Sequence, residues 1–102
     1  SIAKESMHVL MDHELPDEDR EKIRGIAVSH SSVHGVHDMR TRTSGLNIFI
    51  QLHLELDGEI SLTEAHKIAD AVEILINAEY PTADVLIHQD PTGIKEKIVT
   101  FQ

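Results

Sequence analysis

Residues 46–56 alternate between apolar and polar side chains, and this alternation constrains the fold more than any other feature of the sequence. Because successive side chains of a β-strand point to opposite sides of a sheet, it predicts a strand with one buried face. The apolar side consists of Leu46, Ile48, Ile50, Leu52, Leu54 and Leu56, and the other side of Asn47, Phe49, Gln51, His53 and Glu55. Such a strand cannot bury its apolar face alone, so the chain must supply further strands and a covering layer.

Two other segments predict partners for this strand. Residues 36–42 also alternate, and the turn signal at Ser44–Gly45 joins them to residues 46–56 as a hairpin. One side of this segment carries His37, Met39 and Thr41, and the other carries Asp38, Arg40 and Arg42. A short third strand is predicted at residues 85–87, ending at His88-Gln89-Asp90-Pro91, and residues 98–101 carry a weaker strand pattern.

Three segments predict helices. Residues 1–14 have a short amphipathic pattern, and a second helix is predicted over residues 17–30, where Pro16 precedes a cluster of carboxylates. Ser61 and Glu64 form a capping box that begins a third helix, which runs to about Ala78. The expected apolar stripe of the third helix is Leu62, Ala65, Ala69, Val72 and Ile76.

From residue 17 onward, these elements predict a ferredoxin-like α/β (α+β) sandwich with the order αββαβ. The connection from the second strand through the helix to the third strand is a crossover, so those two strands should be parallel. Two helices should cover one face of a three-stranded sheet, over the apolar side of residues 46–56. The other face of the sheet is partly polar, so it must meet solvent or a partner.

Composition excludes several classes of function. The chain has 102 residues, enough for one domain, and a formal net charge of −9, which disfavours a nucleic-acid partner. It has no Cys, which excludes disulfides and thiolate nucleophiles, and only three aromatic residues, too few for a base-stacking platform. Neither a membrane-spanning run nor a signal peptide is visible. Because the chain begins at Ser1 rather than Met, we expect a processed protein or a piece of a longer one.

The chain contains eight histidines, and the predicted hairpin brings two of them together. A turn centred near Gly45 pairs His37 with His53 across the ladder, where opposed Cβ atoms lie ~4.5–5.5 Å apart. His88 and Asp90 point the same way from the neighbouring third strand, and His66 lies at the edge of the apolar stripe of the last helix. Single histidines are more often surface residues, and we interpret His8, His13, His30 and His34 as incidental because they share no face.

Imidazole and carboxylate without thiolate suit Zn²⁺, and also Fe²⁺, Co²⁺ or Ni²⁺. The five candidate ligands, which are His37, His53, His66, His88 and Asp90, exceed one tetrahedral shell. A bridging Asp90 carboxylate that serves two ions would resolve this excess.

Four stretches of the sequence resemble the cytoplasmic C-terminal domain of the cation diffusion facilitators, a family of zinc and iron exporters. They are residues 35–42, 49–55, 64–66 and 87–91, and the resemblance covers roughly residues 7–94. It implies a metallochaperone-like sandwich that forms a homodimer beneath the transmembrane domain of the same polypeptide. It further implies that His37, His53 and Asp90 hold one zinc ion and that His66, His88 and Asp90 hold a second. Gln89 would act in the outer shell or from the partner subunit.

The resemblance implies a metal-sensing and dimerisation domain of a proton-coupled divalent cation efflux transporter, not an enzyme. Two Zn²⁺ per chain are expected, with Fe²⁺, Cd²⁺, Co²⁺ or Ni²⁺ as other cations, and the ions should stabilise a closed dimer and regulate transport. Residues 1–14 would be a linker after the membrane domain, 15–94 the cytoplasmic domain and 95–102 a tail. The domain would lie at the cytoplasmic face of a bacterial inner membrane and be soluble as this fragment.

Two alternatives remain open from the sequence. One is a metal-independent regulatory module that binds a small ligand or a protein, since ferredoxin-like folds serve many functions. The other is a small dizinc hydrolase that uses a metal-bound hydroxide. The hydrolase is the less favoured of the two, because the sequence offers no separate general base and no signature of a substrate pocket.

Overall fold

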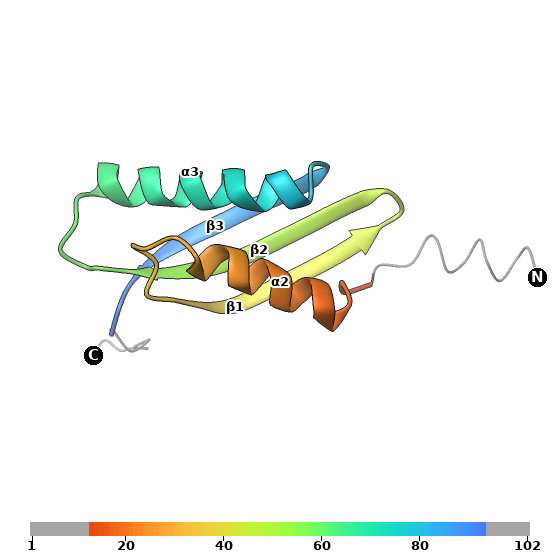
Figure 1. Cartoon of the computed structure of the whole chain (residues 1–102), viewed down its shortest axis with the longest axis horizontal. Coiled ribbons are helices and arrows are strands. Elements are labelled where there is room, and N and C mark those ends of the chain that lie inside the picture. Colours follow the sequence, from red (N-terminus) through yellow and green to blue (C-terminus); the bar gives the residue numbers. More distant parts are fainter. Residues whose placement is uncertain (1–12, 94–102) are drawn as a thin grey trace, which may run out of the picture.

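The computed structural model describes residues 13–93 and contains two helices and three strands (Figure 1). In chain order these are α2 (Asp17–Val28), β1 (Gly35–Ser44), β2 (Asn47–Leu56), α3 (Leu62–Glu79) and β3 (Ala83–Pro91). The helix expected over residues 1–14 lies almost entirely outside the described residues, as does the strand pattern at 98–101. Within residues 13–93, neither helix combines the length and the apolar character needed to cross a membrane.

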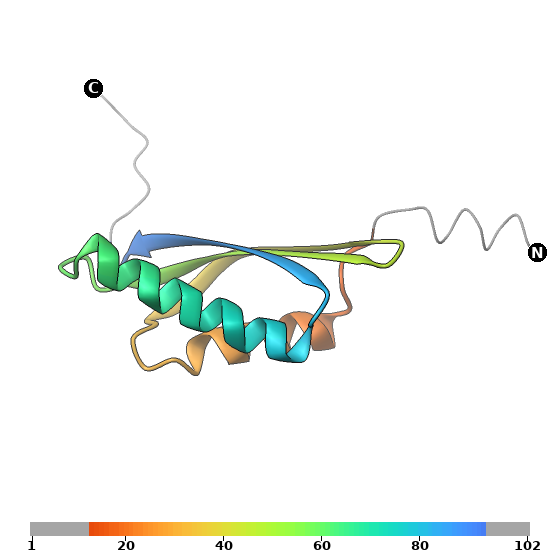
Figure 2. The same ribbon diagram turned by 90° about the horizontal axis from the view of Figure 1, so that it is seen from above.

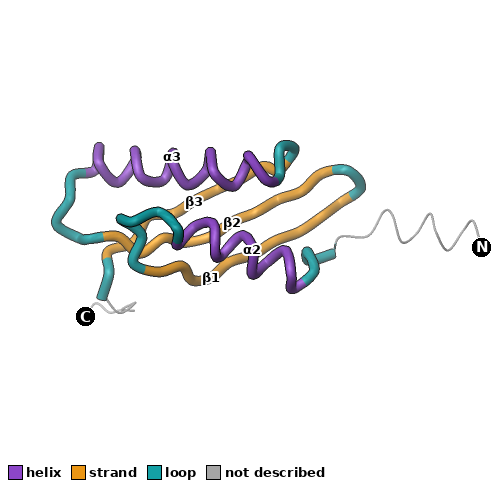
Figure 3. Tube along the Cα trace, in the orientation of Figure 1, coloured by secondary structure: helices purple, strands orange, loops and turns teal. Residues whose placement is uncertain are grey.

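The sheet has the order β1-β2-β3, with β1 antiparallel to β2 and β3 parallel to β2. Both helices lie on the same side of the sheet, so one face is covered and the other is open (Figure 2). A tube coloured by secondary structure shows that the hairpin turn and the loop before α3 lie at opposite ends of the sheet (Figure 3). The predicted αββαβ sandwich, including its parallel crossover, is therefore confirmed.

The core lies between the helices and the apolar side of β2. Every second residue of β2 is buried there, and α2 and α3 supply the residues that pack against it. The buried residues of β2 are Ile50, Leu52, Leu54 and Leu56, and those of the helices are Ile23, Ala27, Ile68, Ala69, Val72 and Ile76. The α3 helix begins as predicted, since the Ser61 hydroxyl accepts a hydrogen bond of 3.0 Å from the Glu64 amide.

Two residues assigned to the apolar sides from the sequence are in fact exposed. Leu46 is 94% exposed because it lies in the two-residue turn between β1 and β2, beyond the part of the hairpin that the helices cover. Leu62 is 82% exposed because it is the first residue of α3, where the helix has not yet reached the core. Ile68 packs into the core instead, one position before the Ala69 that the stripe contained.

The register of β1 is interrupted by a β-bulge between His37 and Arg40. Asp38 has φ = 51°, a left-handed conformation that Asp tolerates better than most side chains. The extra residue reverses the alternation, so Met39 is buried under the helices whereas His37 lies on the open face. The prediction that His37, Met39 and Thr41 share one side was therefore wrong for His37.

The two helices are joined by polar contacts at one end. The Tyr80 hydroxyl, just after α3, donates a hydrogen bond of 2.7 Å to Asp19 Oδ1 in the first turn of α2. Lys22 Nζ lies 2.9 Å from Glu79 Oε1 beside it. Burial of the Tyr80 phenol, together with the Asp19 carboxylate, raises the pKa of Tyr80 to about 12. These contacts hold α2 against the C-terminal end of α3.

Candidate metal centre

The strand register places three imidazoles in one row across the open face of the sheet. His37 pairs with His53 across the antiparallel ladder, and His53 pairs with His88 across the parallel ladder. The next row contains Glu55 opposite Asp90. The predicted pairing of His37 with His53 is confirmed, and β3 supplies His88 and Asp90 from the other side of β2.

The bulge in β1 is the reason that His37 meets His53. The turn pairs Ser44 with Asn47, and an uninterrupted ladder from that turn would place His37 opposite Leu54. The extra residue at the bulge shifts the register by one position and brings His37 opposite His53. The sequence argument reached the same pair by centring the turn on Gly45, which is one half-position away from the observed centre.

Three side chains converge at the middle of these two rows. Asp90 Oδ2 lies 2.9 Å from His53 Nδ1 and 3.1 Å from His37 Nε2. One ligand atom from each of His37, His53 and Asp90 lies within 4.8 Å of the others. The His53 side chain is 22% exposed and that of Asp90 35%, so the group is open enough for an ion to enter from solvent.

Two further carboxylates lie beside these imidazoles, and the sequence analysis did not select either of them. Glu55 Oε2 is 2.9 Å from His37 Nδ1, and Asp38 Oδ2 is 3.6 Å from His53 Nε2. The signal for Glu55 was present, because it follows His53 by two residues and therefore shares its face. Asp38 could not be found in the same way, because the bulge decides where it points.

The other predicted ligands are not part of the group formed by His37, His53 and Asp90, although His88 is in contact with it. The His88 ring stacks on the His53 ring, with centroids 4.6 Å apart and planes inclined by 17°. His66 lies on α3, where Nε2 is 3.3 Å from Asp70 Oδ2 one turn further along the helix. Gln89 is exposed and lines a hollow of about 230 Å³ that Asp90 and the loop before α3 also line.

Three of the histidines interpreted as incidental, His13, His30 and His34, lie outside this group. His34 Nδ1 is 2.9 Å from Thr92 Oγ1, and His30 Nδ1 accepts a hydrogen bond from the Ser32 amide. The His13 backbone forms a bridge with Thr43 near the hairpin turn. His8 lies outside the described residues.

The donor set of His37, His53 and Asp90 fits a divalent metal. Zinc binds imidazole nitrogen and carboxylate oxygen at ~2.0–2.2 Å, so two ligands of a tetrahedral ion lie ~3.4 Å apart. The nitrogen–oxygen separations at Asp90 are 2.9 and 3.1 Å, so they need to widen by only a few tenths of an ångström. Two imidazoles and one carboxylate leave room in a tetrahedral shell for one more ligand.

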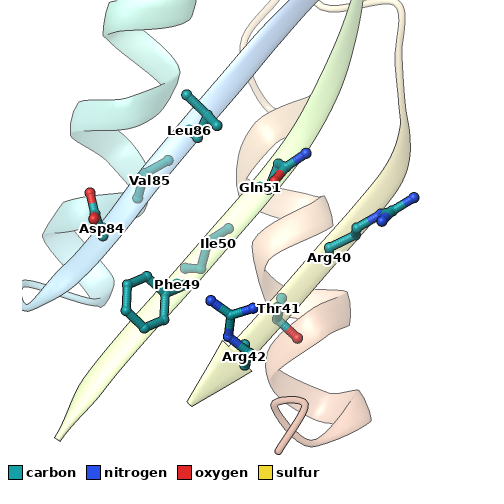
Figure 4. Close-up of a pocket in the computed structure, with 9 residues that line it drawn as sticks. All are labelled: Arg40, Thr41, Arg42, Phe49, Ile50, Gln51, Asp84, Val85 and Leu86. Atoms are coloured by element: carbon teal, nitrogen blue, oxygen red, sulfur yellow. The ribbon is translucent and has the colours of Figure 1, made fainter. Parts of the chain in front are cut away.

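A hollow on the open face lies beside these residues, toward the hairpin turn (Figure 4). Its volume is about 460 Å³, and Arg40, Phe49 and Leu86 are among the side chains that line it. Its lining includes two arginines and several apolar side chains but a single carboxylate, from Asp84, and no imidazole, so it offers few of the ligands that a divalent cation needs. Arg40, which lines the hollow, also contacts Asp38, with its Nε 3.4 Å from Asp38 Oδ1.

Sequence comparisons relate the chain to one family of proteins. Residues 15–92 match a family described as the cytoplasmic domain of cation efflux proteins. Protein p34 of Rickettsia prowazekii (strain Madrid E) is 49% identical over 98 residues, which cover 96% of this chain and 33% of that protein. The cation-efflux pump FieF of Shigella flexneri serotype 5b (strain 8401) is 48% identical over 90 residues, covering 88% of this chain and 30% of the pump. The chain thus spans about a third of the length of the curated relatives it matches.

Solved structures share the fold. A Zn form of CzrB, described as a candidate zinc transporter, matches with a TM-score of 0.74 at 31% sequence identity, covering 85% of this chain and 100% of that one. A nickel form of a MamM CTD variant matches with a TM-score of 0.70 at 21% identity, covering 74% of this chain and 98% of that one. Because its identity is only 21%, the match to the MamM CTD variant shows a shared fold and nothing more.

Proposed function

The chain belongs to the family of cation efflux proteins, as their cytoplasmic domain, and we propose that it senses metal and dimerises in a divalent-cation efflux transporter. The observation that carries the proposal is the convergence of His37, His53 and Asp90 within 4.8 Å on the open face of the sheet. The transporter would place this domain at the cytoplasmic face of a bacterial inner membrane, joined to the transmembrane domain of the same polypeptide. Coupling of export to protons belongs to that membrane domain.

His37, His53 and Asp90 would hold the first zinc ion. The two imidazoles come from β1 and β2 and the carboxylate from β3, so one ion would tie all three strands together. Because the unfolded chain cannot bring these strands together, metal binding would also stabilise the fold. Imidazole must be deprotonated to bind metal, so the affinity should fall as the pH is lowered from neutrality.

His66, His88 and Asp90 would hold the second zinc ion, with Asp90 bridging the two. Asp90 has a second carboxylate oxygen for this purpose, and His88 lies in the same row as His53. For the second site to form, His88 must leave its stacked position on His53 and His66 must leave Asp70. We therefore expect the second ion to bind more weakly than the first. Gln89 would support this ion from the outer shell or from a second subunit.

Zinc would promote a tighter homodimer by reducing electrostatic repulsion. Each chain carries a net charge of −9, so two copies repel one another, and two divalent ions on each copy would offset part of that charge. The open face carries four of the proposed ligands, His37, His53, His88 and Asp90, and has no covering layer within the described residues, so a second copy could lie close to the ions. Binding free energy would then favour the closed dimer over a more open one.

Calorimetric zinc titration of the chain, with the mass of the complex measured by light scattering, tests the proposal. The wild type should bind about two zinc ions per chain, since two imidazoles and a carboxylate oxygen supply each shell. Asp90→Ala should weaken both sites, His53→Ala mainly one, and the control His34→Ala neither, because its ring lies beside Thr92. Fe²⁺, Cd²⁺, Co²⁺ and Ni²⁺ are titrated in the same way to rank the cations.

Three results would contradict the proposal or part of it. Absence of zinc binding by the wild type would favour a metal-independent regulatory module, and zinc binding unchanged by Asp90→Ala would place the metal elsewhere. Zinc binding that leaves both mass and compactness unchanged would remove the sensing mechanism while keeping the site.

A further inference from the structure

The two ring nitrogens of His37 face two different carboxylates. Nδ1 lies 2.9 Å from Glu55 Oε2, and Nε2 lies 3.1 Å from Asp90 Oδ2. A neutral imidazole carries only one N–H and can donate to only one of these carboxylates. If His37 binds a cation beside Asp90, its lone pair must be at Nε2 and its proton at Nδ1, where Glu55 accepts it.

We propose that Glu55 is the residue that positions His37, fixing its tautomer and ring orientation so that Nε2 binds the metal. The proposal rests on the metal site proposed above and adds a carboxylate to it that does not touch the ion. Histidines that bind metals in proteins almost always donate their other ring N–H to a carboxylate, a carbonyl or water, which also makes the binding nitrogen more basic. The 2.9 Å contact between Nδ1 and Oε2 has the length of a charge-assisted hydrogen bond.

The local structure leaves room for Glu55 to act in this way. Glu55 pairs with Gly35 across the β1–β2 ladder, one row beyond the pair of His37 and His53. A Cβ atom at Gly35 would lie 3.2 Å from Glu55 Oε1, which is tighter than most contacts of that kind. The missing side chain at Gly35 therefore gives the Glu55 carboxylate the space in which it meets the His37 ring.

Asp38 provides a matched contrast on the other imidazole. Its Oδ2 lies 3.6 Å from His53 Nε2, which is beyond hydrogen-bonding distance, and its Oδ1 lies 3.4 Å from Arg40 Nε. Asp38 thus places a negative charge close to His37, His53 and Asp90 without fixing the orientation of the His53 ring. Asp38→Asn removes that charge and keeps a side chain that tolerates the left-handed backbone.

Zinc titration of the full chain separates orientation from charge. Glu55→Ala should weaken the first site about tenfold or more, as is usual when a partner of a metal-bound histidine is removed. Glu55→Gln keeps an oxygen that accepts the Nδ1 proton but loses the charge, so its affinity should fall between those of Glu55→Ala and the wild type. Asp38→Asn should weaken the site only about two- to threefold at ~0.15 M salt, because charges several ångströms apart are partly screened. Raising the salt concentration should reduce the effect of Asp38→Asn far more than that of Glu55→Ala.

A second measurement tests the proposal on the metal-free protein. Imidazole ¹⁵N–¹H spectra, recorded at a pH at which the His37 ring is neutral, distinguish a proton at Nδ1 from one at Nε2. The neutral wild-type ring should carry its proton at Nδ1, and Glu55→Ala should show a mixture of tautomers. Gly35→Ala, which displaces the Glu55 carboxylate, should shift the signal in the same direction by a smaller amount.

The outcomes are distinct. A neutral His37 ring that carries its proton at Nε2 in the wild type, or equal zinc affinities of Glu55→Ala and Asp38→Asn, overturns the assignment of Glu55. A wild type that shows the Nδ1 proton but binds no zinc refutes the proposed metal site and leaves the contact between Glu55 and His37 as a hydrogen bond of the fold.

Discussion

On β2, the even-numbered residues from Ile50 to Leu56 are buried beneath the helices, whereas Gln51, His53 and Glu55 lie on the open face. Neighbouring residues of one strand therefore contribute to different properties of the molecule. The covered face consists of packed apolar side chains, and the open face carries imidazoles and carboxylates held 2.9–3.1 Å apart at Asp90. A substitution on one face should change stability, and a substitution on the other should change ligand binding.

The largest expected effect is on the covered face. Leu54 is completely buried, and Leu54→Ala should lower the free energy of unfolding by about 2–5 kcal/mol, through lost burial and the cavity left behind. Urea denaturation of the metal-free chain measures this loss. His53→Ala, the adjacent residue on the open face, is the control and should change the metal-free stability by less than about 1 kcal/mol. A loss as large for His53 as for Leu54 would break the separation of the two faces.

The next effect concerns the bulge that joins the two faces. Asp38 has φ = 51°, and Asp38→Val should lower stability by about 1–2 kcal/mol, because a β-branched side chain tolerates the left-handed region poorly. Asp38→Asn should leave stability nearly unchanged. If Asp38→Val shifts the register instead, His37 will no longer lie opposite His53, and NMR contacts between the two rings will disappear. A stable Asp38→Val variant with the wild-type register would show that the bulge carries no strain.

The contact between Tyr80 and Asp19 gives the covered layer a dependence on alkaline pH. Since folding raises the pKa of Tyr80 from its ordinary value of 10 to about 12, folding favours the neutral phenol. Its contribution to stability is fully present below pH ~10 and is lost as the pH rises through about 12. Tyr80→Phe should cost about 1 kcal/mol near neutral pH and should flatten this part of the pH profile. An equally steep alkaline loss in Tyr80→Phe would assign it to other groups.

The smallest expected effect is at Leu46. This residue belongs to the apolar alternation of residues 46–56 but is 94% exposed in the turn. Leu46→Ser should therefore change the free energy of unfolding by no more than about 0.5 kcal/mol, in contrast to Leu54→Ala. The same urea titration measures both. A loss above about 1 kcal/mol would mean that Leu46 packs against a surface, such as a second subunit.

Much of the fold follows from local patterns in the sequence. The alternation of β2, the cap at Ser61 and the crossover rule predicted the order of elements, the parallel pairing of β3 and the covered face. Two errors lie at the ends of elements, where Leu46 and Leu62 continue a pattern after the packing surface has ended, and a third, the side assigned to His37, lies at the bulge in β1. A period of two or of 3.6 residues shows which side of an element is apolar, but it does not show how far the opposing layer extends.

The candidate site was predictable to a smaller extent. His37, His53, His88 and Asp90 could be selected from their faces and their spacing, and the register confirms that they share the open face. Glu55 was missed although it shares that face, because a glutamate on a polar face is ordinary until its partner is known. The contact of His66 with Asp70 on α3 could not be predicted, because side-chain rotamers on an exposed helix depend on local competition between partners.

The sequence by itself determined the class of the fold, the two faces of the sheet and the chemical type of the candidate ligands. These properties depend on residue type and short-range periodicity, which any chain carries before it folds. The pairing of His37 with His53 was predicted from the sequence, but only the tertiary structure showed that a bulge at Asp38 produces it, and that Glu55 and Asp90 face different nitrogens of the same ring. An added residue in one strand shifts every cross-strand pair beyond it. Where that residue is added depends on the balance between core packing and backbone strain. The side chains that meet across the open face are therefore fixed by the assembled sheet.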